Sequence, residues 1–128
     1  MHNERITRQA AVKVFDWCKK TFGVSSINGP YPKLVFHIKH GEYAAHYNPW
    51  KNEIHIFATR HRTLMGLIGT IIHEFSHYRF QSIKKHYQQL DKIYSYKNHP
   101  LEREANKIER KYKWACYYEV FSPVYKSE

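Results

Sequence analysis

Residues 64–77 read Leu-Met-Gly-Leu-Ile-Gly-Thr-Ile-Ile-His-Glu-Phe-Ser-His, and this stretch decides how the chain folds. Its apolar residues recur with the 3.6-residue period of an α-helix, which predicts a helix that begins near Arg62. The apolar stripe comprises Leu64, Leu67, Ile68, Ile71 and Phe75. His73 and His77 fall on the opposite side, beside small residues that leave room for a substrate or another element. One helix face should therefore pack in a core, while the other presents two imidazoles.

The two histidines are four residues apart, so both rings can reach one metal ion from a single helix face. Glu74 follows the first histidine and completes the pattern H-E-x-x-H. In zinc peptidases a glutamate at this position takes a proton from the metal-activated water and passes it to the leaving amine. The pattern predicts a zinc (Zn2+) site with His73 and His77 as ligands and Glu74 as the general base. The chain holds ten histidines, so the pattern can also arise by chance. The alternative is that His73 and His77 simply lie on a solvated helix face.

A catalytic zinc site also needs a third protein ligand and an open coordination position. The metzincin pattern would put glycine at position 80 and histidine at 83, and Phe80 and Ile83 exclude it. A second helix is predicted from Pro100 to about Val120, and its first turn carries the acids Glu102 and Glu104. These carboxylates lie about 160° apart around the helix, so only one of them can face the metal.

Glu102 is favoured as the third ligand, because Asn106 lies one turn later on the same face and can hydrogen-bond it. Glu104 stays open as the alternative. The helix dipole favours acids in any first turn, so without the upstream motif neither residue would indicate a metal.

The remaining pattern predicts an α+β fold in a single domain, residues 1–128. An amphipathic helix is expected over 5–22, where Gly23 ends it. Alternating apolar residues predict three strands in a small, mostly antiparallel sheet: 33–39, 42–47 and 53–58. The motif helix can extend, with or without a break near Ser82, to about Tyr94, before the acidic helix begins.

Together the two motifs resemble those of gluzincin-type metallopeptidases, which pair H-E-x-x-H on one helix with E-x-x-A-N on a later one. The second motif here is residues 102–106, Glu-Arg-Glu-Ala-Asn. Over residues 42–110 the chain is similar to the ImmA/IrrE family of metallopeptidase domains, although Lys107-Ile108-Glu109 replaces its small, apolar continuation. The resemblance implies a zincin-like fold, zinc held by both histidines and Glu102, catalysis by Glu74, and a protein substrate. SprT-like peptidases, which act on DNA-bound proteins, share the first motif and are the second resemblance.

The net charge introduces other classes of function. Lys and Arg outnumber acids by 21 to 11, a formal charge of +10, which suits contact with nucleic acid or with a nucleic-acid-bound protein. A basic nucleic-acid-binding protein and a zinc-stabilised scaffold without catalysis are therefore the alternatives to a zinc endopeptidase. The charged first residues and the short apolar stretches predict a cytoplasmic location without membrane contact. Cys18 and Cys116 lack metal or redox spacing and should be free thiols.

Three further expectations concern the surroundings of the site. The strand Ile54–Phe57 either edges the cleft, where it can pair with an extended substrate, or is a plain core strand. Tyr112, Tyr117 and His99 are candidate donors for a tetrahedral oxyanion; the sequence distinguishes none of them, and the alternative for each is a structural role. Six histidines have no partner at ligand spacing and are expected to be surface or core residues: His37, His40, His46, His55, His61 and His86.

Overall fold

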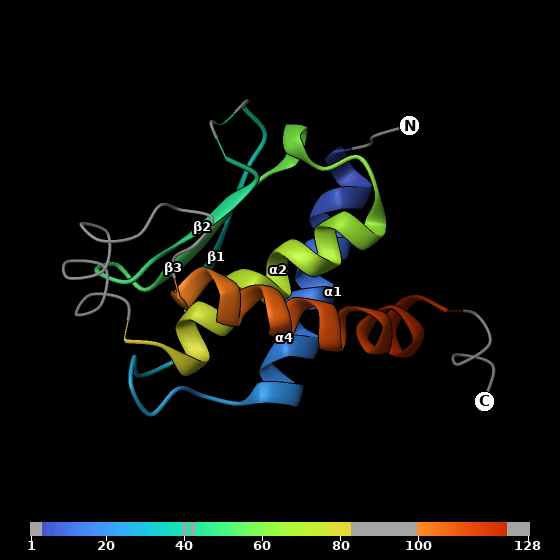
Figure 1. Ribbon diagram of the computed structural model, residues 1–128. Helices are drawn as coiled ribbons and strands as arrows, with labels where there is room; N and C mark the ends of the chain where they lie inside the picture. The colour runs from blue at the N-terminus through green and yellow to red at the C-terminus, as the bar shows by residue number, and fades with distance from the viewer. Residues whose placement is uncertain (1–3, 40, 42, 83–99, 123–128) are drawn as a thin grey trace.

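The computed structural model describes residues 4–39, 41, 43–82 and 100–122 (Figure 1). Its elements follow the order α1 (Glu4–Phe22), β1 (Lys33–His37), β2 (Ala45–Asn48), β3 (Glu53–Phe57), the 3₁₀ turn η1 (Ala58–Arg60), α2 (Leu64–Phe80), α4 (Pro100–Cys116) and the π-helical turn η3 (Tyr117–Phe121). The predicted α+β fold is confirmed, because each expected helix and strand is present within a few residues of its expected bounds. The expected continuation of helix toward Tyr94 lies outside the described residues.

Helix α2 lies at the centre of the molecule, with α1 on one side, α4 on the other and the sheet beside it (Figure 1). Its apolar stripe packs as expected, and Ile68, Ile71 and Phe75 are fully buried. The opposite face is covered too, because α4 occupies the room beside the small residues. Ser76 and His77 are therefore buried as well. A helix enclosed on both faces holds its side chains in fixed positions, which a metal site requires.

Both ends of α2 are fixed by polar contacts. At the start, the Thr63 hydroxyl accepts a hydrogen bond from the Gly66 N–H at 3.0 Å, which caps the helix. At the end, the Asn28 side-chain amide donates to the carbonyls of Tyr78 and Gln81, at 2.6 and 2.8 Å. These bonds satisfy carbonyls that have no partner within the helix. The loop that carries Asn28 thereby fixes the turn of α2 that contains the second motif histidine.

The three strands form a mixed sheet in the order β1-β3-β2, with β3 in the centre. Strands β2 and β3 pair antiparallel, whereas β1 and β3 pair parallel. The prediction of a mostly antiparallel sheet is therefore wrong for the β1–β3 pair. Alternation of apolar residues indicates which face of a strand is buried, and it carries no information about the direction of the neighbouring strand.

The two cysteines lie in the core as free thiols, as predicted. Cys18 on α1 and Cys116 at the end of α4 are both fully buried. Burial raises the pKa of both thiols, that of Cys116 to about 12. Both groups therefore act as small apolar side chains rather than as nucleophiles or metal ligands.

Candidate metal centre

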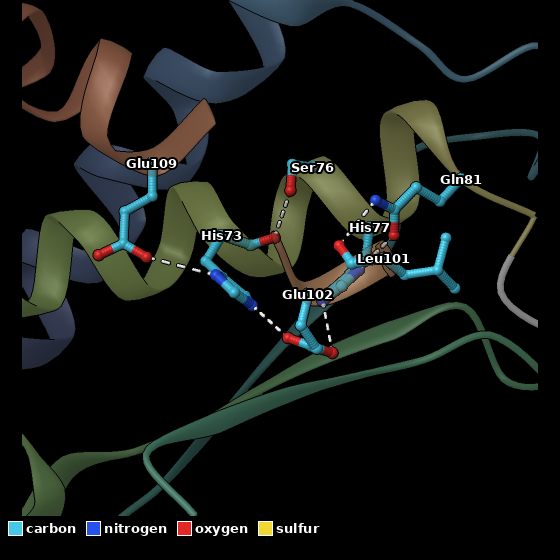
Figure 2. A network of polar contacts seen from close by, with 7 residues as sticks. All are labelled: His73, Ser76, His77, Gln81, Leu101, Glu102 and Glu109. Carbon is cyan, nitrogen blue, oxygen red and sulfur yellow. Dashed lines mark hydrogen bonds and ion pairs between the residues drawn. The ribbon is translucent and has the colours of Figure 1, made fainter. Parts of the chain in front are cut away.

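His73, His77 and Glu102 come together where α2 packs against the first turn of α4 (Figure 2). The carboxylate divides between the rings: Oε1 lies 2.8 Å from Nε2 of His73, and Oε2 lies 3.3 Å from Nε2 of His77. One ligand atom of each residue lies within 4.8 Å of the other two. Ligands that surround zinc at about 2.0–2.2 Å have comparable mutual separations. The three residues therefore fit a metal ion, and they are the one such group in the described ranges.

The far side of the His77 ring is held by Gln81. Nδ1 of His77 lies 2.6 Å from Oε1 of Gln81, while Nε2 of Gln81 donates to the Leu101 carbonyl at 3.0 Å. Because Nε2 of Gln81 donates to the Leu101 carbonyl, Oε1 of Gln81 faces the ring and accepts a hydrogen bond from the Nδ1–H of His77. Nε2 of His77 then faces Glu102, to which it donates its proton here and which it can join as a metal ligand once that proton is lost. The same link ties the end of α2 to the residue before Glu102 and so sets the position of that carboxylate (Figure 2).

The far side of the His73 ring faces a residue that sequence reasoning missed. Oε1 of Glu109 lies 3.3 Å from Nδ1 of His73. Gly69 provides the space, because a Cβ at that position would lie 2.6 Å from Oε2 of Glu109. A carboxylate at Nδ1 fixes the tautomer of a ligating histidine and raises its basicity. The available signal was spacing, since Glu109 follows Glu102 by two helical turns and shares its face.

Glu74 is buried beside this group, with 8% of its surface exposed. The backbone N–H of Tyr47 on β2 donates to its carboxylate. Burial raises the pKa of Glu74, while the neighbouring rings of His77 and His73 oppose the shift. A carboxylate with a raised pKa is suited to take up and release a proton near neutral pH.

The acids also determine the protonation of the two rings. Burial alone would lower the pKa of His73, but the hydrogen bonds to Glu102 and Glu109 and the charge of Glu74 raise it to about 10. Burial likewise lowers the pKa of His77. The hydrogen bond to Glu102 and the charges of Glu74 and Glu102 outweigh this effect, so the pKa of His77 is raised. The carboxylates thus stabilise positive charge between the two histidine rings and Glu102. A bound divalent cation would provide that charge in place of the ring protons.

A cavity of about 260 Å³ opens beside His73 and Glu74. Its wall comprises Tyr43, Ala44, Ala45, Thr70, His73, Glu74, Asn106 and Glu109. Asn106, predicted as a hydrogen-bonding partner of Glu102, lies in this wall. A cavity of this size accommodates a short piece of extended chain rather than a folded surface.

The strand that borders the cavity is β2, not β3. Because β3 is the central strand and pairs on both sides, Ile54–Phe57 is not the edge of the cleft, and the alternative interpretation as a core strand is confirmed. Immediately before β2, the Ala44 carbonyl accepts from the N–H of Phe57 at 3.0 Å. Backbone groups alternate in direction along an antiparallel strand, so those of Ala45 and Tyr47 point away from β3. The N–H of Tyr47 accordingly reaches Glu74, and the backbone of Ala45 points to the same side.

The other predicted site residues lie elsewhere. Glu104, the alternative third ligand, is exposed and is not part of the group. Tyr112 packs edge-on against Phe22, with ring centroids 5.0 Å apart, and Tyr117 also packs against the core. His99 lies outside the described residues. Tyr43, in the cavity wall, was not among the expected hydroxyl donors.

A second cluster of histidines lies on the sheet. Nε2 of His37 on β1 lies 2.7 Å from Nδ1 of His55 on β3, and Nε2 of His55 lies 2.9 Å from Oε1 of Glu53. The His46 ring on β2 stacks on that of His55, with centroids 4.7 Å apart and an interplanar angle of 11°. Their spacing in the sequence indicates no partner for these histidines, because only the pairing of the strands brings them together.

Comparison with protein-family models, with curated proteins and with solved structures returned no match. The resemblance to gluzincin families therefore stays a prediction from the two motifs. No helix within the described ranges is long and apolar enough to cross a bilayer.

Proposed function

We propose that the protein is a zinc-dependent metallopeptidase that hydrolyses peptide bonds of a protein substrate. The observation that carries the proposal is the convergence of His73, His77 and Glu102 beside the buried Glu74. A structural ion-pair network would need the histidines and Glu102, but it has no use for a second buried acid, Glu74, at the mouth of a cavity. This arrangement supports hydrolysis over a scaffold without catalysis.

Each residue then has a definite role. His73 and His77 would hold the metal through Nε2 and Glu102 would hold it through its carboxylate, while Gln81 and Glu109 orient the rings. When bound, zinc supplies Lewis acidity, which lowers the pKa of water and polarises a carbonyl. Glu74 accepts a proton at its carboxylate and returns it to the leaving amine. The Tyr47 N–H keeps that carboxylate directed toward the cavity.

The border of the cavity favours a peptide as substrate. The backbone groups of Ala45 point away from β3, on the side where Glu74 lies, while the Tyr47 N–H on the same side already donates to Glu74. An extended peptide can add to such an edge through main-chain hydrogen bonds, which requires little of its sequence. We therefore infer that the substrate binds along β2 in an extended conformation.

The test combines metal content with turnover. Untagged protein should contain about one zinc per chain, and incubation with a mixed-sequence peptide library should give cleavage products that mass spectrometry detects. Glu74→Gln should retain the zinc and lose about 10²–10⁴-fold in rate, the usual contribution of a general base. Glu104→Gln, the matched exposed acid, should change neither quantity.

Three results would contradict the proposal in different ways. Protein that neither contains nor takes up zinc has no such metal centre. Zinc retention without cleavage in the wild type supports the scaffold. Equal cleavage by the wild type and Glu74→Gln would mean that another group is the base, or that a contaminant is responsible.

A further inference from the structure

The outward face of α4 carries a continuous row of basic and aromatic side chains. At about 100° per residue its members fall within roughly 100° of one another, so they share one side of the helix: Arg103, Lys107, Arg110, Lys111, Trp114 and Tyr118. All six are exposed, and the last of them lies in η3. We call this set the α4 stripe. The acids Glu102 and Glu109 lie on the opposite side of the same helix, toward α2, so the stripe is separate from the candidate metal centre.

The positive charges of the α4 stripe form no ion pair with the rest of the described chain, although the exposed Glu104 lies at the edge of the stripe. Within residues 4–39, 41, 43–82 and 100–122, no carboxylate forms an ion pair with its two arginines or its two lysines. Lys111 instead lies over the Tyr112 ring, with Nζ 5.4 Å from the centroid. The four charges thus face solvent along one line. Such a row attracts a polyanion whose charges are also arranged in a line.

The aromatic end of the α4 stripe consists of two large side chains that are largely open to solvent. Trp114 is 52% exposed and Tyr118 is 44% exposed. Their rings lie 6.0 Å apart at an interplanar angle of 32°, and Tyr117 contacts both of them edge-on. Exposed rings beside cationic side chains are the combination that holds unpaired bases by stacking and phosphates by charge.

We propose that the α4 stripe binds single-stranded nucleic acid, with phosphates along the arginines and lysines and bases on Trp114 and Tyr118. From Arg103 to Tyr118 the helix extends about 22 Å, enough for a few nucleotides. An anionic membrane is a poorer match, because the apolar face of α4 packs against α2 and the core and is not available to lipid. A duplex is a poorer match too, since its bases are already stacked on one another.

The experiment measures fluorescence anisotropy of a labelled single-stranded oligonucleotide with the full chain. EDTA is present, so that a metal ion cannot contribute a phosphate contact. The test variant is Arg103→Gln/Lys107→Gln/Arg110→Gln/Lys111→Gln. Its matched control removes four exposed lysines from other elements: Lys13→Gln/Lys20→Gln/Lys33→Gln/Lys51→Gln. Both variants have the same net charge, so a difference between them reports position rather than total charge.

We expect the test variant to bind the oligonucleotide on the order of 100-fold more weakly at 0.1 M salt. The plot of log affinity against log salt concentration should also be flatter, because each lost phosphate contact reduces its slope by about 0.7 for a single strand. The control should bind within a few-fold of the wild type. Trp114→Ala and Tyr118→Ala should each weaken binding roughly tenfold while the salt slope stays unchanged. Circular dichroism and the unfolding midpoint check that each variant is folded.

Equal weakening by the test variant and the control would overturn the proposal, because binding would then follow net charge alone. Duplex binding as tight as single-strand binding, and insensitive to Trp114→Ala, would overturn the assignment to single strands. Binding to phosphatidylserine vesicles without binding to the oligonucleotide would assign the surface to a membrane instead. Since none of these measurements needs zinc, the result is independent of the proposed peptidase activity.

Discussion

The molecule holds two histidine clusters that differ in geometry and charge. At the α2–α4 contact, two imidazole nitrogens converge on the two oxygens of Glu102. On the sheet, the rings of His46 and His55 lie nearly parallel, so their nitrogens do not converge on one point with that of His37. Ligand atoms must converge for a metal to bind, and only the helical cluster meets that condition among the described residues.

Charge separates the clusters as clearly as geometry does. Carboxylates surround the helical cluster and raise the pKa of both its histidines. On the sheet, burial and the neighbouring His55 lower the pKa of His37 and His46. Histidine number therefore says little about metal binding in this chain. The acids that face the rings, and the direction of their lone pairs, distinguish a candidate centre from a packed surface.

The largest expected effect comes from removing one member of each cluster. His77→Ala should abolish zinc binding, because it removes a ligand, whereas His46→Asn should leave about one zinc per chain. Zinc at 1,000 times its dissociation constant stabilises a folded protein by about 4 kcal/mol. Thermal unfolding with and without zinc measures this. The zinc-dependent rise in the midpoint should persist in His46→Asn and vanish in His77→Ala.

A metal-free control completes that comparison. In EDTA both variants must still unfold cooperatively, so that a lost zinc effect cannot be confused with a lost fold. If His46→Asn loses the zinc and His77→Ala keeps it, the metal centre lies on the sheet and the assignment of the two clusters is reversed.

A smaller effect is expected where Gly69 makes room for Glu109. Glu109→Gln should weaken zinc binding about 10–100-fold, because His73 loses the carboxylate that orients its ring. Gly69→Ala should weaken it by a similar factor, since the added Cβ would lie 2.6 Å from Oε2 of Glu109 and displace that side chain. Competition with a chromogenic chelator measures both affinities.

The double variant makes this prediction specific. If both changes act by withdrawing the same carboxylate, Gly69→Ala/Glu109→Gln should bind zinc no more weakly than the weaker single variant. Fully additive losses would show that Gly69 acts on α2 itself. Gly66→Ala is the matched control for helix propensity, because it adds the same methyl group to α2 beside Thr63 and away from Glu109.

The sequence predicts most of what lies within a single element. The period of the apolar stripe locates α2, and the i,i+4 spacing puts His73 and His77 on one face, as the structure has them. Local periodicity is sufficient for these features because each depends on neighbours within two turns.

What the sequence does not predict depends on how elements pair. The direction of β1 relative to β3 cannot be read from alternation, so the expected antiparallel pairing is wrong for that pair of strands. For the same reason the sequence left open whether Ile54–Phe57 edges the cleft or is a core strand. The contact of Glu109 with His73 depends on the approach of α4 to α2 over Gly69. The meeting of His37 with His55 depends on strand register, which becomes known only with the fold.

The smallest expected effect concerns pH and the sheet cluster. The pKa of His37 and His46 lies below the ordinary value of 6.5 in the folded protein. The unfolded chain therefore binds these protons first as the pH falls, which stabilises the unfolded state. The contribution of this cluster to stability should be complete above pH 6.5 and should decline below it. Urea unfolding of the wild type at pH 7.5 and 5.0 measures the decline.

The groups that face these two rings are His55 and Glu53 on the central strand, and both remain in the variant His37→Asn/His46→Asn. That variant should lose less stability than the wild type between pH 7.5 and 5.0, although the difference is small because His46 is exposed. Ring resonances followed by NMR give the two pKa values directly, with urea-unfolded protein as the reference. Titration of either ring above the unfolded value would reverse the sign, and the sheet cluster would then resemble the helical one in its charge.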